Sequence, residues 1–332
     1  MRSTGNLMGV LATAGALVLA SARPAAAQDE EFDPFVHGAN TVRGQSWSDP
    51  RTGPDTQTRT GISWPLSEVN EDPEYYGWGC HVTQASDTPI GCVINPEGST
   101  DVVVVGSSYV GQWIPAILEI AEREDWAVTI HTKTWCDFQP GREITVPDTY
   151  LECDSFNTQV QDLLRQDVPD IIITSHYDVT AAPHLVRVYR DLIGRGVQDV
   201  VGIWNSNGAF ADEGPGLSKA AWCVRDIQFN DYTGDYTTCH YGTGDPTQQG
   251  NRAMRVVDAA LPDFHYLPLQ DWMCPPDSTV APRCPGVIGR VVPWRDGAHL
   301  TNEWTHSMTN VVHEALHLEG VTSGRPEDEP VP

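Results

Sequence analysis

Apolar positions between residues 101 and 318 alternate between two patterns. Short, fully apolar runs rich in β-branched residues predict strands buried on both faces, as in a parallel sheet covered by helices. Longer segments repeat apolar residues at helical spacing and predict amphipathic helices. The predicted strands cover 101–105, 127–132, 170–174, 199–204 and 264–267, with 289–292 as a final short strand or an extended segment. The predicted helices cover 112–124, 156–166, 186–195, 247–261 and 302–318.

Alternating strands and helices define the fold class. Consecutive parallel strands need crossover connections, and helices in those connections cover both faces of the sheet. The sequence therefore predicts an α/β protein with a doubly wound parallel sheet in three layers, α/β/α. This stretch is long enough for one large core, and no internal repeat is visible.

The ends of the chain differ in composition from the middle. Arg2, an apolar stretch at 7–20 and small residues up to Ala27 predict a signal peptide over 1–27. Residues 28–75 are predicted as an irregular acidic lead-in that wraps the domain, 76–322 as the domain itself and 323–332 as a flexible tail. No later apolar run reaches the roughly 18 residues that span a bilayer. We therefore expect a secreted or extracytoplasmic protein whose mature chain does not insert into a membrane.

Charge limits the class of partner. The chain has 45 acidic residues against 20 lysines and arginines, a formal net charge of −25. Such a surface repels nucleic acids and anionic membranes, so neither is expected as a partner. The sequence does not address the oligomeric state.

Eight cysteines in an exported chain predict disulfide bonds. They occur as four closely spaced pairs, and there is no C-x-x-C motif that would suggest a zinc ribbon. We predict the pairs Cys80–Cys92, Cys136–Cys153, Cys223–Cys239 and Cys274–Cys284.

A small-residue turn joins the first buried strand to the first helix. Gly106, Ser107 and Ser108 follow the four valines of 101–105. A serine at a helix entrance lies beside free backbone N–H groups and the positive end of the helix dipole. This environment suits a nucleophile whose reaction creates an oxyanion, although both serines could simply cap the helix.

A second motif precedes the last helix. In Asp296-Gly-Ala-His299 a carboxylate and an imidazole share one short loop, and Thr301 is suited to cap the helix that follows. The carboxylate can accept a hydrogen bond from one ring nitrogen, which leaves the other to act as a general base toward a serine. An ordinary Asp and His on a surface loop is the alternative.

Together, the serine turn and the Asp-x-x-His motif resemble the SGNH/GDSL hydrolase superfamily. They are most similar to the extracytoplasmic SGNH domain associated with acyltransferase-3 proteins, in which a Cys-Pro…Cys loop also precedes Asp-x-x-His. Here that loop runs from Cys274-Pro275 to Cys284, and the resemblance covers about 101–318.

The resemblance implies a flavodoxin-like sheet and a serine esterase or acyltransferase without cofactor or metal. Ser108 would be the nucleophile because it takes the serine position of the family's Gly-Asp-Ser turn, His299 the base and Asp296 its orienting acid. The implied substrates are O-acyl esters, chiefly O-acetyl, of an envelope or extracellular polysaccharide, so an acylated carbohydrate is the expected partner.

The sequence departs from the family pattern around the oxyanion hole. Ser107 stands where the family has Asp, and Gly-x-Asn-Asp is absent. The candidate donors are the N–H of Ser108 together with Ser175 and Asn205, which follow predicted strands. Either of the last two could be an ordinary turn residue. A domain that kept the fold, lost the chemistry and binds carbohydrate is the alternative function.

One motif competes with this interpretation. His313-Glu-Ala-Leu-His317 matches the H-E-x-x-H pattern of zinc proteases. No histidine stands where that pattern would need its third ligand, and the apolar stripe of the helix predicts that both histidines face solvent. Four tryptophans near strand ends or loops are candidates for a sugar-stacking platform or for core anchors, namely Trp204, Trp222, Trp272 and Trp294.

Overall fold

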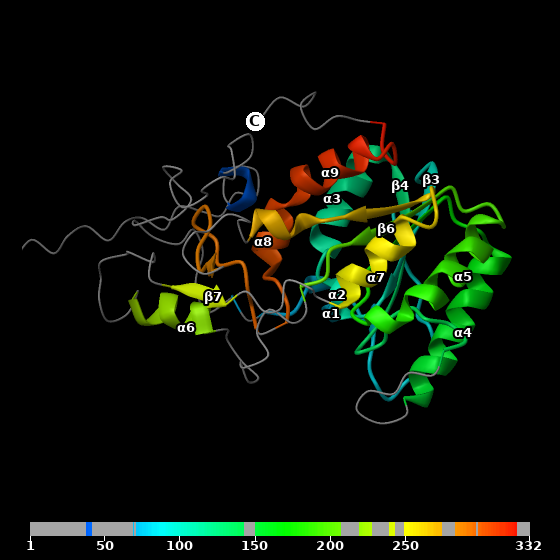
Figure 1. The fold of residues 1–332 in the computed structure, drawn as a ribbon, viewed down its shortest axis with the longest axis horizontal. Coiled ribbons are helices and arrows are strands. Elements are labelled where there is room, and N and C mark those ends of the chain that lie inside the picture. The colour runs from blue at the N-terminus through cyan, green and yellow to red at the C-terminus, as the bar shows by residue number, and fades with distance from the viewer. Residues whose placement is uncertain are drawn as a thin grey trace, which may run out of the picture.

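The computed structural model describes residues 38–41, 69, 71–142, 150–206, 219–227, 239–242, 249–273, 283–296 and 298–323. The predicted signal peptide, most of the lead-in and nearly all of the tail lie outside these residues. Within the described residues, a seven-stranded sheet forms the centre of the molecule (Figure 1).

The sheet has the strand order β1-β4-β3-β5-β6-β8, with β2 also paired to β4. All of its pairings are parallel except that of β2 with β4. The predicted α/β class is therefore confirmed. The predicted parallel sheet is corrected at one edge, where β2 is antiparallel. The strands are β1 His81–Val82, β2 Cys92–Ile94, β3 Thr100–Gly106, β4 Trp126–Lys133, β5 Ile171–Thr174, β6 Asp199–Ile203 and β8 Phe264–Leu267.

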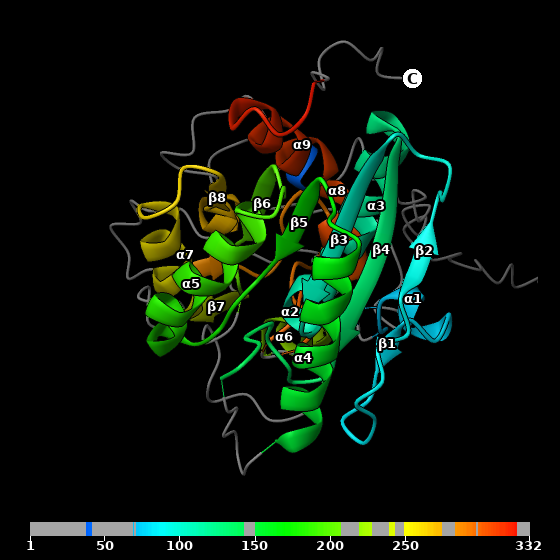
Figure 2. The same ribbon diagram turned by 90° about the vertical axis from the view of Figure 1, so that its right-hand side faces the viewer.

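The valines of β3 explain the three layers. Successive side chains of a strand point to opposite faces. Val102 and Val104 belong to one core, while Val103 and Val105 belong to the other. The first core is covered by α3 Ile114–Glu124, α8 Asn302–Ser307 and α9 Thr309–Leu318, and the second by α4 Leu151–Gln166, α5 Ala182–Ile193 and α7 Gln249–Asp258 (Figures 1 and 2).

Several helix boundaries differ from the predicted ones. The predicted helix at 112–124 is preceded by a separate short helix, α2 Ser108–Gly111, and α4 begins at Leu151 rather than near 156. The predicted last helix is divided into α8 and α9 at Met308. Near this break Thr305 and Ser307 donate their hydroxyl hydrogens to the carbonyls of Asn302 and Trp304 in α8, an alternative to the regular helix ladder. Residues 289–292 form no strand and contribute only to the isolated bridge between Ile288 and Val291.

The described part of the lead-in belongs to the core. Ala39, Val69 and Tyr75 are at most 1% exposed and join the cluster under α3 and α9. The 3₁₀ turn Gly38–Thr41 anchors this segment, because the backbone N–H of Gly38 donates to the Gly289 carbonyl at 2.8 Å. A short helix, α1 Glu74–Gly77, completes this region. Ala39, Val69 and Tyr75 therefore pack against the domain.

Three of the predicted disulfides are formed: Cys80–Cys92, Cys136–Cys153 and Cys223–Cys239. The fourth pair includes Cys274, which lies outside the described residues. Cys223–Cys239 joins α6 Lys219–Asp226 to a two-stranded sheet of β7 His240–Gly242 and β9 Arg283–Pro285, elements that the hydrophobic pattern did not predict. In the part of the chain covered by the structure, no helix is long and apolar enough to cross a bilayer.

Candidate active site

The turn after β3 presents Ser108 at the start of α2. Gly106 ends the strand with φ of 141°, a conformation that glycine adopts most readily. Ser107 is then the N-cap of α2 and its side chain accepts from the N–H of Tyr109 at 3.4 Å. Ser108, partly exposed, is the first helical residue, where backbone N–H groups are not used by the helix itself.

Asp296 organises the loop that carries His299. Its Oδ1 accepts backbone N–H groups of Ala298 at 2.7 Å and of His299 at 2.8 Å. Both oxygens also lie close to Nδ1 of His299, at 3.1 and 3.0 Å. Burial opposes ionisation of Asp296, but the hydrogen bond and charge of His299, the Ala298 N–H and the charge of Arg295 outweigh burial and lower its pKa to about 2. An ionised carboxylate is therefore fixed against the imidazole.

The two loops meet at the carboxyl edge of the sheet. Nε2 of His299 lies 2.8 Å from Oγ of Ser108, although the two residues are 191 positions apart in the sequence. When Nδ1–H donates to Asp296, Nε2 is left as the acceptor for the serine proton. The ring of Tyr109 stacks on the imidazole at 5.4 Å between centroids. This arrangement can activate a serine hydroxyl for attack on a carbonyl carbon.

The candidate oxyanion donors beyond Ser108 occupy buried positions. The side-chain amide of Asn205 donates to the His176 carbonyl at 2.9 Å, and its backbone exchanges two hydrogen bonds of 2.8 Å with the Asn251 side chain. Ser175 is fully buried, and its Oγ has no hydrogen-bond partner within the described residues. The side-chain amide of Asn205 is therefore already engaged by a backbone carbonyl, whereas the Ser175 hydroxyl remains a candidate donor beside the backbone N–H of Ser108.

Gln112, which the sequence analysis did not identify, hydrogen-bonds the loop that carries His299 and a neighbouring serine. Its Oε1 accepts from the N–H of Leu300 at 2.8 Å, and its Nε2 donates to Oγ of Ser206 at 3.1 Å. Ser206 in turn donates to the Ala298 carbonyl. Gln112 is four residues after Ser108 and is buried, so it ties the nucleophile's segment to the loop of His299. No local motif marks this glutamine, because its partners lie far away in the sequence.

The tryptophan pair that sequence analysis placed near strand ends is part of the core. Trp204 and Trp294 are at most 1% exposed and pack edge to face with their centroids 6.1 Å apart. They are core anchors and are closed to a sugar ring. Trp222 is exposed on α6.

The prediction that both histidines of the H-E-x-x-H motif face solvent was wrong for His313, while His317 is partly exposed. His313 is 3% exposed, and its Nε2 lies 2.6 Å from Oε1 of Glu124, because α9 packs against α3, which ends at Glu124. Nδ1 of His317 lies 3.2 Å from the Thr322 carbonyl. Among the residues that the structure describes, no group of three His, Cys, Asp or Glu side chains is placed to hold a metal ion.

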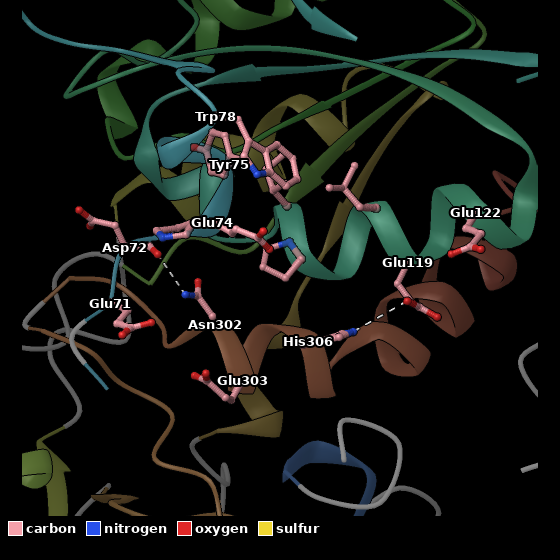
Figure 3. Close-up of a pocket in the computed structure, with 14 residues that line it drawn as sticks. Glu71, Asp72, Glu74, Tyr75, Trp78, Glu119, Glu122, Asn302, Glu303 and His306 are labelled. Atoms are coloured by element: carbon pink, nitrogen blue, oxygen red, sulfur yellow. Dashed lines mark hydrogen bonds and ion pairs between the residues drawn. The ribbon is translucent and has the colours of Figure 1, made fainter. Parts of the chain in front are cut away.

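A cavity of about 590 Å³ lies between α1, α3 and α8 (Figure 3). Ser108, Asp296 and His299 are not among the residues that line it. Asp72 on its rim accepts from Arg295 at 2.9 Å, and Nε of Arg295 lies 3.4 Å from Asp296. The cavity is thus linked to Asp296 through one buried arginine. Its carboxylates are Glu71, Asp72, Glu74, Glu119, Glu122 and Glu303.

Gly106→Ala is expected to destabilise the protein by about 1–3 kcal/mol, because a non-glycine residue at this φ is strained. An added Cβ would also lie 3.2 Å from the side chain of Val110. Denaturant unfolding measures the change. Gly77→Ala is the matched control, since Gly77 has negative φ and no atom within 4 Å of the added methyl group. Equal stability of the two variants would contradict the strained turn.

An α/β/α sandwich with Ser, His and Asp at the carboxyl edge of its sheet has the architecture of an SGNH-type hydrolase. The chain belongs to this family: residues 79–314 match the model of the SGNH domain that is fused to AT3 domains. The family is of the esterase and acyltransferase type, as the sequence motifs had indicated.

Two solved structures show distant similarity. The periplasmic domain of a lipopolysaccharide acetyltransferase from Salmonella ser. Paratyphi A has a TM-score of 0.49 and 12% identity, over 76% of this chain and 99% of that one. A carbohydrate esterase family 2 enzyme with a carbohydrate-binding domain, from Corynascus thermopiles (Myceliophthora fergusii), has a TM-score of 0.35 and 13% identity, over 67% and 66%. No curated protein matches the sequence.

Proposed function

We propose that this protein is a secreted serine esterase or acyltransferase that acts on O-acyl esters, chiefly O-acetyl esters, of an envelope or extracellular polysaccharide. The contact of 2.8 Å between Ser108 Oγ and His299 Nε2, with Asp296 behind the imidazole, is the observation that carries the proposal. It occurs in a chain of the SGNH family, at the positions that the family resemblance assigns.

In the first half of the reaction, Oγ of Ser108 attacks the ester carbonyl while Nε2 of His299 takes its proton. The negative charge on the carbonyl oxygen develops beside the N–H of Ser108 at the start of α2. Asp296 stabilises the imidazolium without accepting its proton. When the bond to the sugar oxygen breaks, His299 returns the proton to that oxygen and an acyl-serine remains.

In the second half, water or a sugar hydroxyl attacks the acyl-serine. His299 takes the proton of the attacking group and then returns it to Oγ of Ser108. Attack by water gives hydrolysis, whereas attack by a sugar hydroxyl gives acyl transfer. Both outcomes use the same three side chains and need no further group.

The environment of the chain supports an extracellular substrate. Three disulfides are typical of oxidising compartments outside the cytoplasm. The strong negative charge disfavours polyanionic partners such as nucleic acids. An acylated carbohydrate fits these limits and the substrate class that the family resemblance implies.

The proposal is tested by hydrolysis of a chromogenic acetate ester with and without a chelator. We expect the same rate in both, because the three side chains complete the reaction without a metal. A fluorophosphonate probe should label Ser108, as identified by peptide mass spectrometry. Activity that disappears with the chelator would contradict the serine mechanism. An inactive, unlabelled protein on both this ester and an acetylated polysaccharide would favour the non-catalytic carbohydrate-binding alternative.

A further inference from the structure

A buried carboxylate outside the triad is bonded to the residue beside the nucleophile. Asp137 is completely buried in the loop after β4. Its Oδ1 accepts from the hydroxyl of Ser107 at 2.9 Å. Ser107 is the N-cap of α2 and directly precedes Ser108, so Asp137 holds the turn from which Ser108 projects.

The second oxygen of this carboxylate reaches another loop. Oδ2 of Asp137 accepts from the backbone N–H of Tyr177 at 2.7 Å. Tyr177 follows β5, two residues after Ser175, at the same edge of the sheet as the nucleophile turn. One carboxylate therefore joins the β3–α2 turn to the β5–α5 loop, which together border Ser108.

The position of Asp137 is itself fixed. The preceding residue, Cys136, is bound to Cys153 of α4. The side-chain amide of Asn157, one turn further along α4, donates to the Asp137 carbonyl at 2.9 Å. Because α4 and the disulfide restrain this loop, Asp137 is a rigid point to which both active-site loops are attached.

We propose that Asp137 is a positioning residue that acts through Ser107 to set Ser108 and the first N–H groups of α2 against the β5–α5 loop. The inference rests on the proposed function and adds a residue to it. In a reacting site, small displacements are costly: a misplacement of about 1 Å can lower the rate by about 10²-fold.

The charge of this group makes the inference testable by pH. Burial raises the pKa of Asp137 to about 7, although the Tyr177 N–H and the hydroxyl of Ser107 oppose the shift. When ionised, both oxygens accept; when protonated, one oxygen carries a hydrogen and no longer serves only as an acceptor. The titratable groups that face it are His176, whose Nδ1 lies 3.9 Å from Oδ2, and also Asp178, Tyr109, Tyr177 and Tyr189. Burial lowers the pKa of His176 to about 3, so this neighbour is neutral near pH 7.

The experiment measures the rate of Ser108 labelling by a fluorophosphonate in the wild type and in Asp137→Asn across pH. At about pH 8.5, where the wild-type carboxylate is ionised, we expect the variant to react about 10- to 100-fold more slowly. At about pH 5.5 the two rates should approach each other, because Asp137 of the wild type is then protonated.

Two further variants separate positioning from general damage. Ser107→Ala should reproduce the loss, and the double variant should be no slower than either single variant, since both act through one hydrogen bond. Asp191→Asn is the matched control: this carboxylate lies on α5 and pairs with Arg165 and Arg195 instead of with the active-site loops, so its removal should leave the rate unchanged.

As pH rises, the stability of Asp137→Asn relative to the wild type should increase, while its reactivity relative to the wild type should fall. Because folding raises the pKa of Asp137 from 3.8 to about 7, its protonation favours the folded state below pH 3.8, and this contribution is lost as pH rises through 7. Asp137→Asn lacks this dependence. Relative to the wild type, its melting temperature should therefore be highest at alkaline pH, where its rate of labelling relative to the wild type is lowest.

The outcomes are distinct. If Ser108 of the wild type is not labelled at all, the proposed function fails, and this inference with it. If the wild type is labelled but Asp137→Asn reacts equally fast at about pH 8.5, only the positioning role fails. A loss that is the same at every pH and follows the melting temperature would also overturn it, because that pattern indicates a purely structural role.

Discussion

Ser108→Ala is expected to lower kcat/KM for ester hydrolysis by about 10⁴- to 10⁶-fold, the range seen when the nucleophile of a serine triad is removed. The methyl group cannot form the acyl-enzyme, and His299 loses the hydroxyl that lies 2.8 Å from Nε2. The fold should persist, since the Ser108 side chain is partly exposed and the cap of α2 is Ser107. Steady-state kinetics with the chromogenic ester measures the loss, and thermal unfolding verifies the fold.

The matched control for this variant is Ser99→Ala. Ser99 lies in the loop before β3, and its Oγ donates to the Asp125 carbonyl at 3.4 Å, away from the catalytic loops. It should keep the wild-type rate. A Ser108→Ala protein with more than about a tenth of the wild-type activity would show that another group performs the chemistry, since loss of a nucleophile costs orders of magnitude more.

Asp296→Asn is expected to lower kcat by about 10⁴-fold while leaving KM almost unchanged. The amide can offer an N–H to Nδ1 of His299, which favours the tautomer whose Nε2 carries the hydrogen and cannot accept from Ser108. Because folding lowers the pKa of Asp296 from 3.8 to about 2, the wild-type carboxylate is ionised throughout an ordinary assay range. The loss should therefore be similar at every pH tested, which a pH profile of kcat measures.

Asp72→Asn is the control for the acid. Asp72 also contacts Arg295, but it is exposed and does not touch His299. We expect its activity to remain within about twofold of the wild type, as for exposed ion pairs in general. If Asp72→Asn and Asp296→Asn lost activity equally, the arginine rather than the tautomer of His299 would be the important element.

The central sheet could be predicted from the sequence because its strands are buried on both faces. A run such as Val102 to Val105 contains no polar residue that could face solvent, so it predicts a strand buried on both faces. The glycine and serines that follow mark its end. The weaker elements were missed where local pattern carries little signal. β1 and β2 are very short, and in the first turn of α4 Leu151 is exposed while the disulfide-bonded Cys153 is the buried residue.

Within the site, the sequence identified residues whose chemistry is visible in isolation. Ser108 follows a strand, and Asp296 and His299 share one loop, so each half is a local motif. Asp137 and Gln112 gave no such signal, because their roles depend on partners that are far away in the sequence. For His313, the local pattern suggested a role that the structure does not show. Its spacing to His317 resembles a metal site, yet α9 packs on α3 and brings His313 against Glu124.

The sequence by itself determined the α/β class, the positions of the central strands, three close disulfide pairs and the two motifs of the candidate triad. These properties depend on residues near each other in the chain: side-chain periodicity, turn residues and short loops. Only the tertiary structure decided that Ser108 and His299 touch, that Asp137 holds Ser107, and that Trp204 and Trp294 are buried. Those facts depend on which parallel strands lie side by side, because the carboxyl ends of neighbouring strands bring distant residues to one edge of the sheet.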